Sequence, residues 1–534
     1  MNKKLKIYST AIVTSLVLFF GSCNDLDQIP QGQFTDDTYW YSTEKASYVL
    51  NMGYNQMMNS GYFFANEALS DNIFSCRTSD EKLISSGIAN ATTGRFANEW
   101  ADCYGGIRTC NTFLENVDRV PDMTPTLKAR MIAEARFIRA SLFFRLTSWY
   151  GDVPLFEKNL TFAESKIIRR APHADVIKFV REELDAAAAA LPPSYTGNDV
   201  GRVTSGAAIA LKARTYLYEN DWENTALVCN EIITSETYSL FPDYAGLFSI
   251  QNQNNKEVIL DIQYVPSLRT WSQYFDFAPP SAGRRVNQQA PTQELVDSYL
   301  TLNGDSIRQT GSGYSENNPY VNRDPRLAAT VLFDGGKWKM PDGTEMAIKI
   351  KPGSGTIDEY KPGSGNNSLT GYYMKKYSDP TYTGNFESGL NLILIRYADI
   401  LLMYAEAKNE LGQMDKTVWD QTIKPIRARA GFTTANALEF KATWTQDDLR
   451  KIIRNERRVE LALEGTRVFD IRRWKIAEEV LNVYPHGAKY GPSSIDNGYI
   501  RLDKRSFNPN RDYLFAVPQA QKDLNPNLGQ NLGY

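Results

Sequence analysis

Helical periodicity in two long stretches, roughly residues 38–235 and 392–475, constrains the fold of this chain more than any other feature. Thr124 followed by Pro125 is typical of a helix N-cap and first helical residue, and Gly151 predicts the end of that helix. Between them, apolar residues recur at spacings of three and four, as in Leu127, Met131, Ala135, Ile138, Leu142, Leu146 and Trp149. Similar patterns predict helices at 175–191, 206–218, 222–233, 392–411 and 445–465, the last opened by a capping box at Thr445.

Successive amphipathic helices joined by short turns predict a mostly α-helical fold built from helix-pair repeats of the tetratricopeptide type. Between the two helical stretches, prolines, glycines and asparagines break the chain into short strands and loops, such as the strand expected at 257–264. We therefore expect one compact unit over residues 23–534. It has an N-terminal helical part (23–240), an irregular, loop-rich lobe with short strands (241–390) and a C-terminal helical part (391–534).

The first 22 residues have the pattern of an export signal. Three lysines precede an apolar run at 11–20, which is too short to span a membrane, and small residues stand directly before Cys23. Phe20-Gly-Ser-Cys23 resembles a bacterial lipobox, which predicts a lipid on Cys23 and membrane attachment through this N-terminal lipid. The alternative is an ordinary cleaved signal peptide with an incidental cysteine.

Composition excludes several classes of function. The net charge is −3, and without the three signal lysines it is about −6. This mildly acidic balance argues against nucleic-acid binding. The chain has only two histidines, His173 and His486, which argues against a metal site or an imidazole-based catalytic centre. We therefore expect no metal, no cofactor and no enzymatic activity. The 30 tyrosines, 25 phenylalanines and 9 tryptophans favour a binding surface instead.

The cysteines of the mature chain do not suggest a disulfide scaffold. Cys103 and Cys110 are seven residues apart in a predicted helix, which separates their Cα atoms by ~10 Å, beyond the reach of a disulfide. We interpret these two residues, together with Cys76 and Cys229, as buried thiols, with one long-range disulfide as the alternative.

Ordered motifs along nearly the whole chain resemble the RagB/SusD-like family of outer-membrane nutrient-uptake lipoproteins. The most specific are Glu456-Arg-Arg-Val-Glu460, Glu464-Gly465, Arg467 and Asp470-Ile-Arg-Arg-Trp474. Others are Glu134-Ala-Arg-Phe-Ile-Arg-Ala140, Trp149-Tyr-Gly-Asp-Val-Pro154, Asn322-Arg-Asp-Pro-Arg326, Arg396-Tyr-Ala-Asp399 and the C-terminal Gln530-Asn-Leu-Gly-Tyr534. Thr466 departs from the bulkier residue that the family usually carries, and this leaves the assignment intact.

The resemblance implies a surface-exposed, lipid-anchored protein of the outer membrane, built from about four tetratricopeptide-like helix pairs that support a ligand-binding lobe. Such proteins capture a ligand, mostly an oligosaccharide, for import through a TonB-dependent SusC-like transporter. Asn24-Asp-Leu-Asp27 resembles the acidic signal that sends such lipoproteins to the cell surface, although it could also be a solvated linker. The alternatives are a peptide-binding lid of the same kind of transporter, a surface glycoside hydrolase, and a scaffold that only holds other proteins.

The glutamates within residues 456–464 could suggest an enzyme that uses carboxylates. Glu456, Glu460 and Glu464 recur every four residues, so they share one helix face, whereas a glycosidase needs two carboxylates across a cleft. The interleaved arginines favour ion pairs that join this helix to its neighbours.

Sugar recognition requires flat apolar faces with polar groups around them, and residues 265–285 offer that mixture in a predicted loop. We expect aromatic platforms at Trp271, Tyr274 and Phe275 and polar partners at Arg269, Gln273 and Asp276. The alternative is a loop packed by its own aromatic side chains. A second candidate region contains Asp71, Asn72 and Arg77, and weaker candidates are Trp338 and Tyr382.

Overall fold

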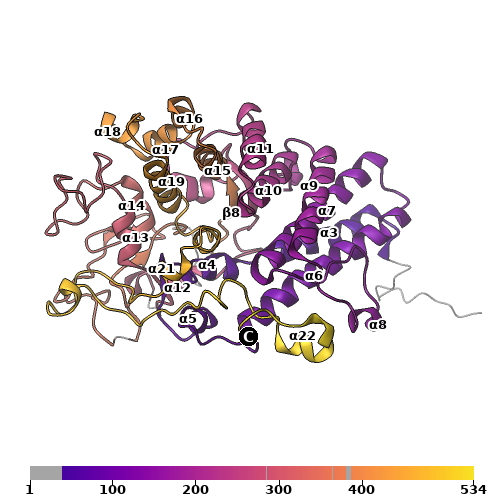
Figure 1. The fold of residues 1–534 in the computed structure, drawn as a ribbon, viewed down its shortest axis with the longest axis horizontal. Coiled ribbons are helices and arrows are strands. Elements are labelled where there is room, and N and C mark those ends of the chain that lie inside the picture. Colours follow the sequence, from indigo (N-terminus) through magenta and orange to yellow (C-terminus); the bar gives the residue numbers. More distant parts are fainter. Residues whose placement is uncertain (1–38, 284–285, 364, 380–386) are drawn as a thin grey trace, which may run out of the picture.

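The computed structural model describes residues 39–283, 286–363, 365–379 and 387–534 (Figure 1). The signal sequence, Cys23, the acidic segment 24–27 and Tyr382 lie outside the described residues.

A series of helices, each packed against the next in chain order, forms the larger part of the molecule. They are α3 (Thr43–Met57), α6 (Gly94–Asn116), α7 (Pro125–Tyr150), α9 (His173–Ala190), α10 (Ser205–Tyr218), α11 (Trp222–Thr234), α15 (Tyr397–Glu410) and α19 (Gln446–Glu460). Figure 1 shows the first members of the series on the right and the later ones towards the upper left. The predicted fold of stacked helix pairs is confirmed.

Local sequence signals set several helix ends as expected. Thr124 caps α7 by accepting a hydrogen bond from the Leu127 amide, and Gly151 ends that helix with a φ of 70°. At α19 the Thr445 hydroxyl accepts from the Asp448 amide at 3.1 Å, while the Asp448 carboxylate accepts from the Thr445 amide at 3.0 Å. This capping box satisfies backbone donors that have no partner within the helix.

Shorter elements build the lobe and the connections around the helical series. The α-helices are α4 (Ser60–Ala68), α5 (Asp80–Ser85), α8 (Phe162–Ser165), α12 (Tyr274–Phe277), α13 (Gln293–Ser298), α14 (Pro325–Thr330), α16 (Lys416–Gln421), α17 (Ile423–Ala430), α18 (Ala435–Leu438), α20 (Arg467–Arg473), α21 (Ala477–Val480) and α22 (Gln519–Leu524). The 3₁₀ turns are η1 (Val117–Arg119), η2 (Gly197–Asp199), η3 (Gly246–Phe248), η4 (Ile250–Asn252), η5 (Pro280–Ala282), η6 (Asp496–Gly498) and η7 (Pro526–Leu528).

The strands of the described residues form antiparallel pairs. These are β1 (Ile73–Ser75) with β3 (Gln289–Pro291), β2 (Val258–Ile262) with β8 (Leu392–Arg396), β4 (Val331–Leu332) with β7 (Tyr373–Met374), and β5 (Lys337–Lys339) with β6 (Glu345–Ala347).

The prediction of one helix over residues 392–411 is wrong at its start. Residues 392–396 form β8, in which Leu392 pairs with Ile262 and Arg396 with Val258, and α15 begins only at Tyr397. Because this strand is largely buried on both faces, it reads as an apolar run without alternation, which periodicity cannot distinguish from a helix. The helix predicted at 445–465 ends at Glu460.

Apolar side chains gather in two main clusters. The first fills the helical series, and the second lies in the lobe around the β4·β7 pair, including Phe64, Trp271, Tyr373 and Ile393. The four cysteines beyond the N-terminal segment are buried free thiols, as predicted. None of the described helices combines the length and apolar character that crossing a membrane requires.

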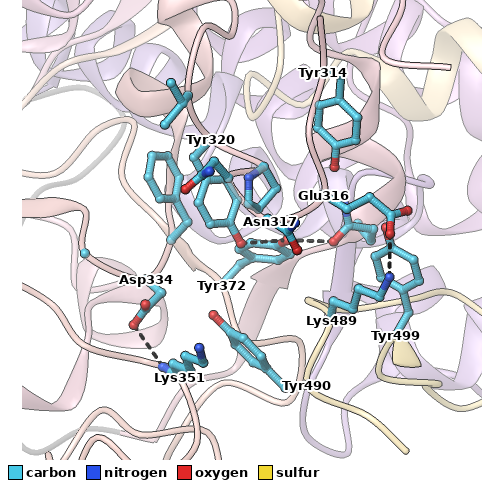
Figure 2. Close-up of a pocket in the computed structure, with 16 residues that line it drawn as sticks. Tyr314, Glu316, Asn317, Tyr320, Asp334, Lys351, Tyr372, Lys489, Tyr490 and Tyr499 are labelled. Carbon is cyan, nitrogen blue, oxygen red and sulfur yellow. Dashed lines mark hydrogen bonds and ion pairs between the residues drawn. The ribbon is translucent and has the colours of Figure 1, made fainter. Parts of the chain in front are cut away.

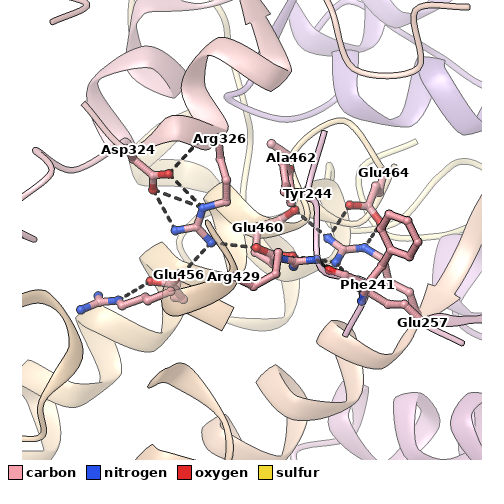
Figure 3. A network of polar contacts seen from close by, with 12 residues as sticks. Phe241, Tyr244, Glu257, Asp324, Arg326, Arg429, Glu456, Glu460, Ala462 and Glu464 are labelled. Carbon is pink, nitrogen blue, oxygen red and sulfur yellow. Dashed lines mark hydrogen bonds and ion pairs between the residues drawn. The ribbon is translucent and has the colours of Figure 1, made fainter. Parts of the chain in front are cut away.

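A buried network of ion pairs surrounds Glu456, Glu460 and Glu464 (Figure 3). Glu460 on α19 accepts from Arg326 at 2.8 Å and from Arg396 at 2.7 Å, and Arg429 also pairs with it. Glu456 pairs with Arg326 at 2.7 Å and with Arg427 at 2.8 Å, whereas Glu464 pairs with Arg396 at 2.8 Å and with Lys376 at 2.6 Å. The prediction that this block forms structural ion pairs is confirmed, but the glutamates pair with arginines of other segments, and the interleaved Arg457 and Arg473 pair with other carboxylates. Their carboxylates are buried, so they do not face a substrate cleft.

Candidate ligand-binding site

The predicted binding loop at 265–285 packs partly into the lobe core. Trp271 is only 3% exposed, its indole Nε1 donates to the Leu390 carbonyl at 2.7 Å, and its ring lies against Phe64 at 5.0 Å. A ring covered in this way offers no face to a ligand. The prediction that Trp271 is an exposed platform is therefore wrong, and the alternative, a loop packed by its own aromatics, applies to this residue. Trp338 is buried as well.

The remaining residues predicted in this loop take different positions. Arg269 stacks on Tyr264 and donates to the Gln263 carbonyl at 2.6 Å and to Asn55 Oδ1 at 2.8 Å, so its guanidinium is already engaged. Gln273 and Asp276 are partly exposed. The backbone of Tyr274 and Phe275 lies in α12, and their side chains are outside the described part of the chain.

Asp71 and Asn72, predicted as ligand contacts, are structural. Asp71 is buried and pairs with Arg467 at 2.8 Å and with Arg458 at 3.0 Å, and Asn72 Oδ1 accepts from Arg458 at 2.9 Å. The two arginines hold the pKa of the Asp71 carboxyl well below its usual range although burial opposes this. The prediction of these two residues as exposed ligand contacts is wrong, because arginines of the C-terminal half occupy their polar atoms.

The two predicted regions nevertheless meet in space. Asn287 links them, since its Nδ2 donates to the Asp276 carbonyl at 3.2 Å and its Oδ1 accepts from Cys76 Sγ at 3.3 Å. Arg77 is partly buried and donates to the carbonyls of Cys76 and Gly365. Arg77, Gln273 and Asp276 thus remain candidates, because each is partly exposed and close in sequence to this junction.

A second site, which the sequence did not single out, is a cavity of about 480 Å³ lined by tyrosines (Figure 2). We call it the tyrosine pocket. It lies where the loop 314–321, the turn after β4, the start of β7 and the C-terminal segment 489–499 come together. Its aromatic and polar lining comprises Tyr314, Tyr320, Phe333, Tyr372, Tyr490 and Tyr499, with Gln293, Glu316, Asn317, Asn318, Asp334, Lys351 and Lys489.

Aromatic contacts and hydrogen bonds fix the back of this pocket. Tyr320 stacks on Phe333 with ring centroids 4.0 Å apart and an interplanar angle of 15°. Its hydroxyl donates to the Tyr372 hydroxyl at 3.2 Å, and Tyr372 in turn donates to Gln293 Oε1 at 2.6 Å. These hydrogen bonds hold the aromatic rings in position before a ligand binds, which reduces the entropy lost on binding.

Polar contacts hold the loops around the pocket in place. Arg323 donates to the carbonyls of Pro319 at 2.7 Å, Val296 at 2.6 Å and Tyr299 at 2.8 Å, so it anchors the loop that carries Tyr320. Figure 2 shows Lys489 and Glu316 joined across one side of the pocket, with Nζ and Oε2 2.7 Å apart.

Asp334 Oδ1 accepts from the amides of Ile350 and Lys351 at 2.7 and 2.9 Å, which fixes the opposite side of the pocket. Both carboxylates of the lining, Asp334 and Glu316, therefore already have partners.

The phenols of the pocket are neutral hydrogen-bonding groups. Burial raises the pKa of Tyr314 and of Tyr320 to about 12, and it also raises the pKa of Tyr490 and Tyr499. A neutral hydroxyl both donates and accepts, and Asn317 and Asn318 add amide groups on the exposed side. Flat apolar rings beside neutral donors and acceptors suit a ligand that carries many hydroxyl groups.

Sequence reasoning missed this pocket because its residues come from segments far apart in the chain. A signal was present, since Tyr314, Tyr320, Tyr490 and Tyr499 stand among Gly, Ser, Asn and Pro, which favour turns, where a large aromatic residue has no helix face to bury. Nothing in one sequence, however, shows that residues 314–320 and 489–499 lie side by side.

Comparison with known proteins shows similarity along nearly the whole chain. The sequence model described as "SusD family" matches residues 246–534, and one described as "Starch-binding associating with outer membrane" matches residues 37–217. A SusD-like protein of Formosa agariphila is 25% identical over 551 residues, which cover 99% of this chain and 99% of that protein.

Solved structures agree with the sequence matches. The crystal structure of a SusD-like carbohydrate binding protein from Bacteroides fragilis is similar with a TM-score of 0.83 and 30% identity, covering 92% of this chain and 100% of that one. A laminarin binding SusD-like protein shares the fold with a TM-score of 0.68 and 22% identity, covering 93% of this chain and 100% of that one.

Proposed function

Because this chain belongs to the SusD family, we propose that it binds an oligosaccharide at the outer membrane and hands it on for uptake. The observation that carries the proposal is the tyrosine pocket, where aromatic rings stand beside neutral hydroxyl and amide groups. Such rings cover the C–H face of a sugar, and the polar groups replace the water that its hydroxyls lose. The pre-positioned Tyr320 and Tyr372 make this pocket a ready binding surface.

The cellular setting of this proposal comes from the family and the N-terminal sequence. A lipid on Cys23 would tether the protein, and the acidic residues that follow it would direct it to the cell surface. There it acts as the substrate-binding lid of a TonB-dependent SusC-like transporter. Its role is capture without cleavage, since the most suggestive row of glutamates, Glu456, Glu460 and Glu464, is buried and ion-paired.

The decisive test compares two tyrosines of the same C-terminal segment. Tyr499 lines the pocket, whereas Tyr484 is 45% exposed and lies outside the pocket lining. A glycan array of the mature chain identifies a ligand, and calorimetric titration then measures its affinity for the wild type, Tyr499→Ala and Tyr484→Ala. We expect Tyr499→Ala to weaken binding about fivefold, because an aromatic contact contributes about 1 kcal/mol, and Tyr484→Ala to leave the affinity unchanged.

Other outcomes would assign a different function. Equal affinity of the two variants would remove the tyrosine pocket from the proposal. Binding of peptides from a library, with no glycan bound, would favour the peptide-binding lid. Shortening of the bound glycan during incubation, detected by mass spectrometry, would show a hydrolase.

A further inference from the structure

A second cavity of the lobe differs from the tyrosine pocket in its charge. It has a volume of about 660 Å³ and lies between the segment 245–251, the start of α14, the tip of the β5–β6 hairpin and the residues after β7. Three lysines, Lys339, Lys375 and Lys376, line it, and none of its lining residues is a carboxylate. We call it the lysine pocket. It shares no lining residue with the tyrosine pocket.

The three lysines differ in how their charge is compensated. Lys376 is buried, and its Nζ donates to Glu464 at 2.6 Å, to the Ala462 carbonyl at 2.8 Å and to the Tyr244 hydroxyl at 3.0 Å. Its charge is therefore taken up by the ion-pair network behind the pocket. Lys339 and Lys375 form no side-chain hydrogen bond or ion pair with any residue that the structure describes.

The nearest acidic groups are already engaged elsewhere. Glu345, opposite Lys339 in the β5·β6 register, pairs with Lys337 Nζ at 3.0 Å. Asp342, at the hairpin turn, accepts from the amide and hydroxyl of Thr344 at 2.9 and 2.6 Å. Glu345 also attracts Lys375 and Lys339 electrostatically. Because Lys337, Lys339 and Lys375 outnumber Glu345 and Asp342, this side of the pocket keeps a positive charge.

Secondary structure fixes the backbone of both lysines. Lys339 is the last residue of β5, and the Lys375 amide, directly after β7, donates to the Thr330 carbonyl at 2.9 Å. Lys375 is partly buried beside the apolar wall of the pocket, which includes Phe248, Ala329 and Met340, and this burial lowers its pKa. A partly desolvated ammonium gains more from an anionic partner than a fully hydrated one does.

We propose that the lysine pocket binds an acidic sugar unit, whose carboxylate or sulfate group lies between Lys339 and Lys375 while its ring covers the apolar wall. This inference rests on the proposed function and adds a ligand class to it, namely a saccharide that carries anionic substituents. In the tyrosine pocket, Lys489 pairs with Glu316 and the phenols are neutral. That pocket then accepts uncharged sugar units.

The experiment uses defined tetrasaccharides and the mature chain. Calorimetric titration compares tetragalacturonate, its methyl ester, a sulfated galactan tetrasaccharide and neutral maltotetraose, with inorganic sulfate as a control for simple anion binding. The variants are Lys375→Gln and Lys339→Gln. The matched control is Lys349→Gln, an exposed lysine of the same lobe that lines neither pocket.

We expect an acidic tetrasaccharide to bind, and Lys375→Gln or Lys339→Gln to weaken it at least about tenfold, as expected for the loss of a charge-assisted hydrogen bond. Lys349→Gln should change the affinity by less than about twofold, and added salt should weaken binding through screening. Preference for the uronate identifies a carboxylated sugar, and preference for the galactan identifies a sulfated one.

Four results would overturn the inference. These are measurable and equal binding of tetragalacturonate and its methyl ester, equal affinity of Lys375→Gln and the wild type, inorganic sulfate binding as tightly as the saccharides, and binding of maltotetraose alone. The last result would leave the proposed function standing. If no saccharide of either kind binds, here or on the glycan array, the proposed function fails together with the inference.

Discussion

Replacing Glu460 by glutamine removes the negative charge at the centre of the buried network while keeping the shape of the side chain. The carboxylate accepts from Arg326 at 2.8 Å and from Arg396 at 2.7 Å, and it also pairs with Arg429. The residue is fully buried, so water cannot replace the lost partner. The nearby arginines hold the pKa of Glu460 well below its usual range against the opposing effect of burial, so the carboxylate is ionised at neutral pH.

The size of the effect follows from the number of charged partners. A hydrogen bond to a charged group contributes about 1.5–3 kcal/mol, and three such bonds set an upper limit of roughly 5–9 kcal/mol. The glutamine oxygen keeps one acceptor, and the guanidinium groups retain other carboxylates, such as Glu257 and Glu456. We therefore expect Glu460→Gln to lower the free energy of unfolding by about 3–5 kcal/mol, the range found when one partner of a buried ion pair is removed.

Urea unfolding of the mature chain, followed by tryptophan fluorescence, measures this loss as a shift of the midpoint. The matched control is Glu439→Gln, which removes an exposed carboxylate that pairs with Lys424 at 2.7 Å. Because that pair lies in water, its loss should cost less than about 1 kcal/mol. If the two variants unfold at the same urea concentration, the network does not stabilise the fold in the way argued.

Three further predictions concern single residues. Cys23→Ala should move the protein from the membrane fraction to the soluble fraction, and unchanged membrane association would disprove the lipid anchor. Trp271→Ala should cost about 3–5 kcal/mol of stability in the same urea assay, because it empties a buried site and leaves the Leu390 carbonyl without its donor. Burial raises the pKa of Glu67 to about 7, so its stabilising contribution is complete below the pKa of the unfolded chain, about 4.3, and is lost as the pH rises through 7. Glu67→Gln should therefore be more stable relative to the wild type at about pH 8 than at about pH 5, and equal differences in thermal melts would contradict this.

Much of the fold could be predicted because its signals are local. The cap at Thr124 and the capping box at Thr445 depend on residues within one helical turn, and the four-residue spacing of Glu456 and Glu460 shows directly which face they share. The strand at 392–396 was missed because its buried apolar run depends on its partner β2, which is more than 100 residues away in the sequence.

The binding site was harder to predict because exposure is a property of the folded chain. The residues around Trp271 in the sequence have the composition of a sugar-binding loop, yet packing against Phe64 buries the Trp271 ring. Asp71 was expected to be a free polar contact, whereas Arg458 and Arg467, almost 400 residues away, use its oxygens. The tyrosine pocket arises where separate loops meet, and its lining could be found only in three dimensions.

The network around α19 also limits how this protein can be engineered. Arg326 and Arg396, which lie on separate segments, both pair with Glu460 of α19, and Glu257 pairs with Arg396. Cutting the chain at the C-terminal border of the lobe would separate Glu257 and Arg326 from Arg396 and Glu460 and leave buried charges without partners on both fragments. A chimaera that exchanges the lobe to alter ligand choice must therefore keep Glu257, Arg326 and Arg396, whereas loops around the two pockets can be swapped without touching them.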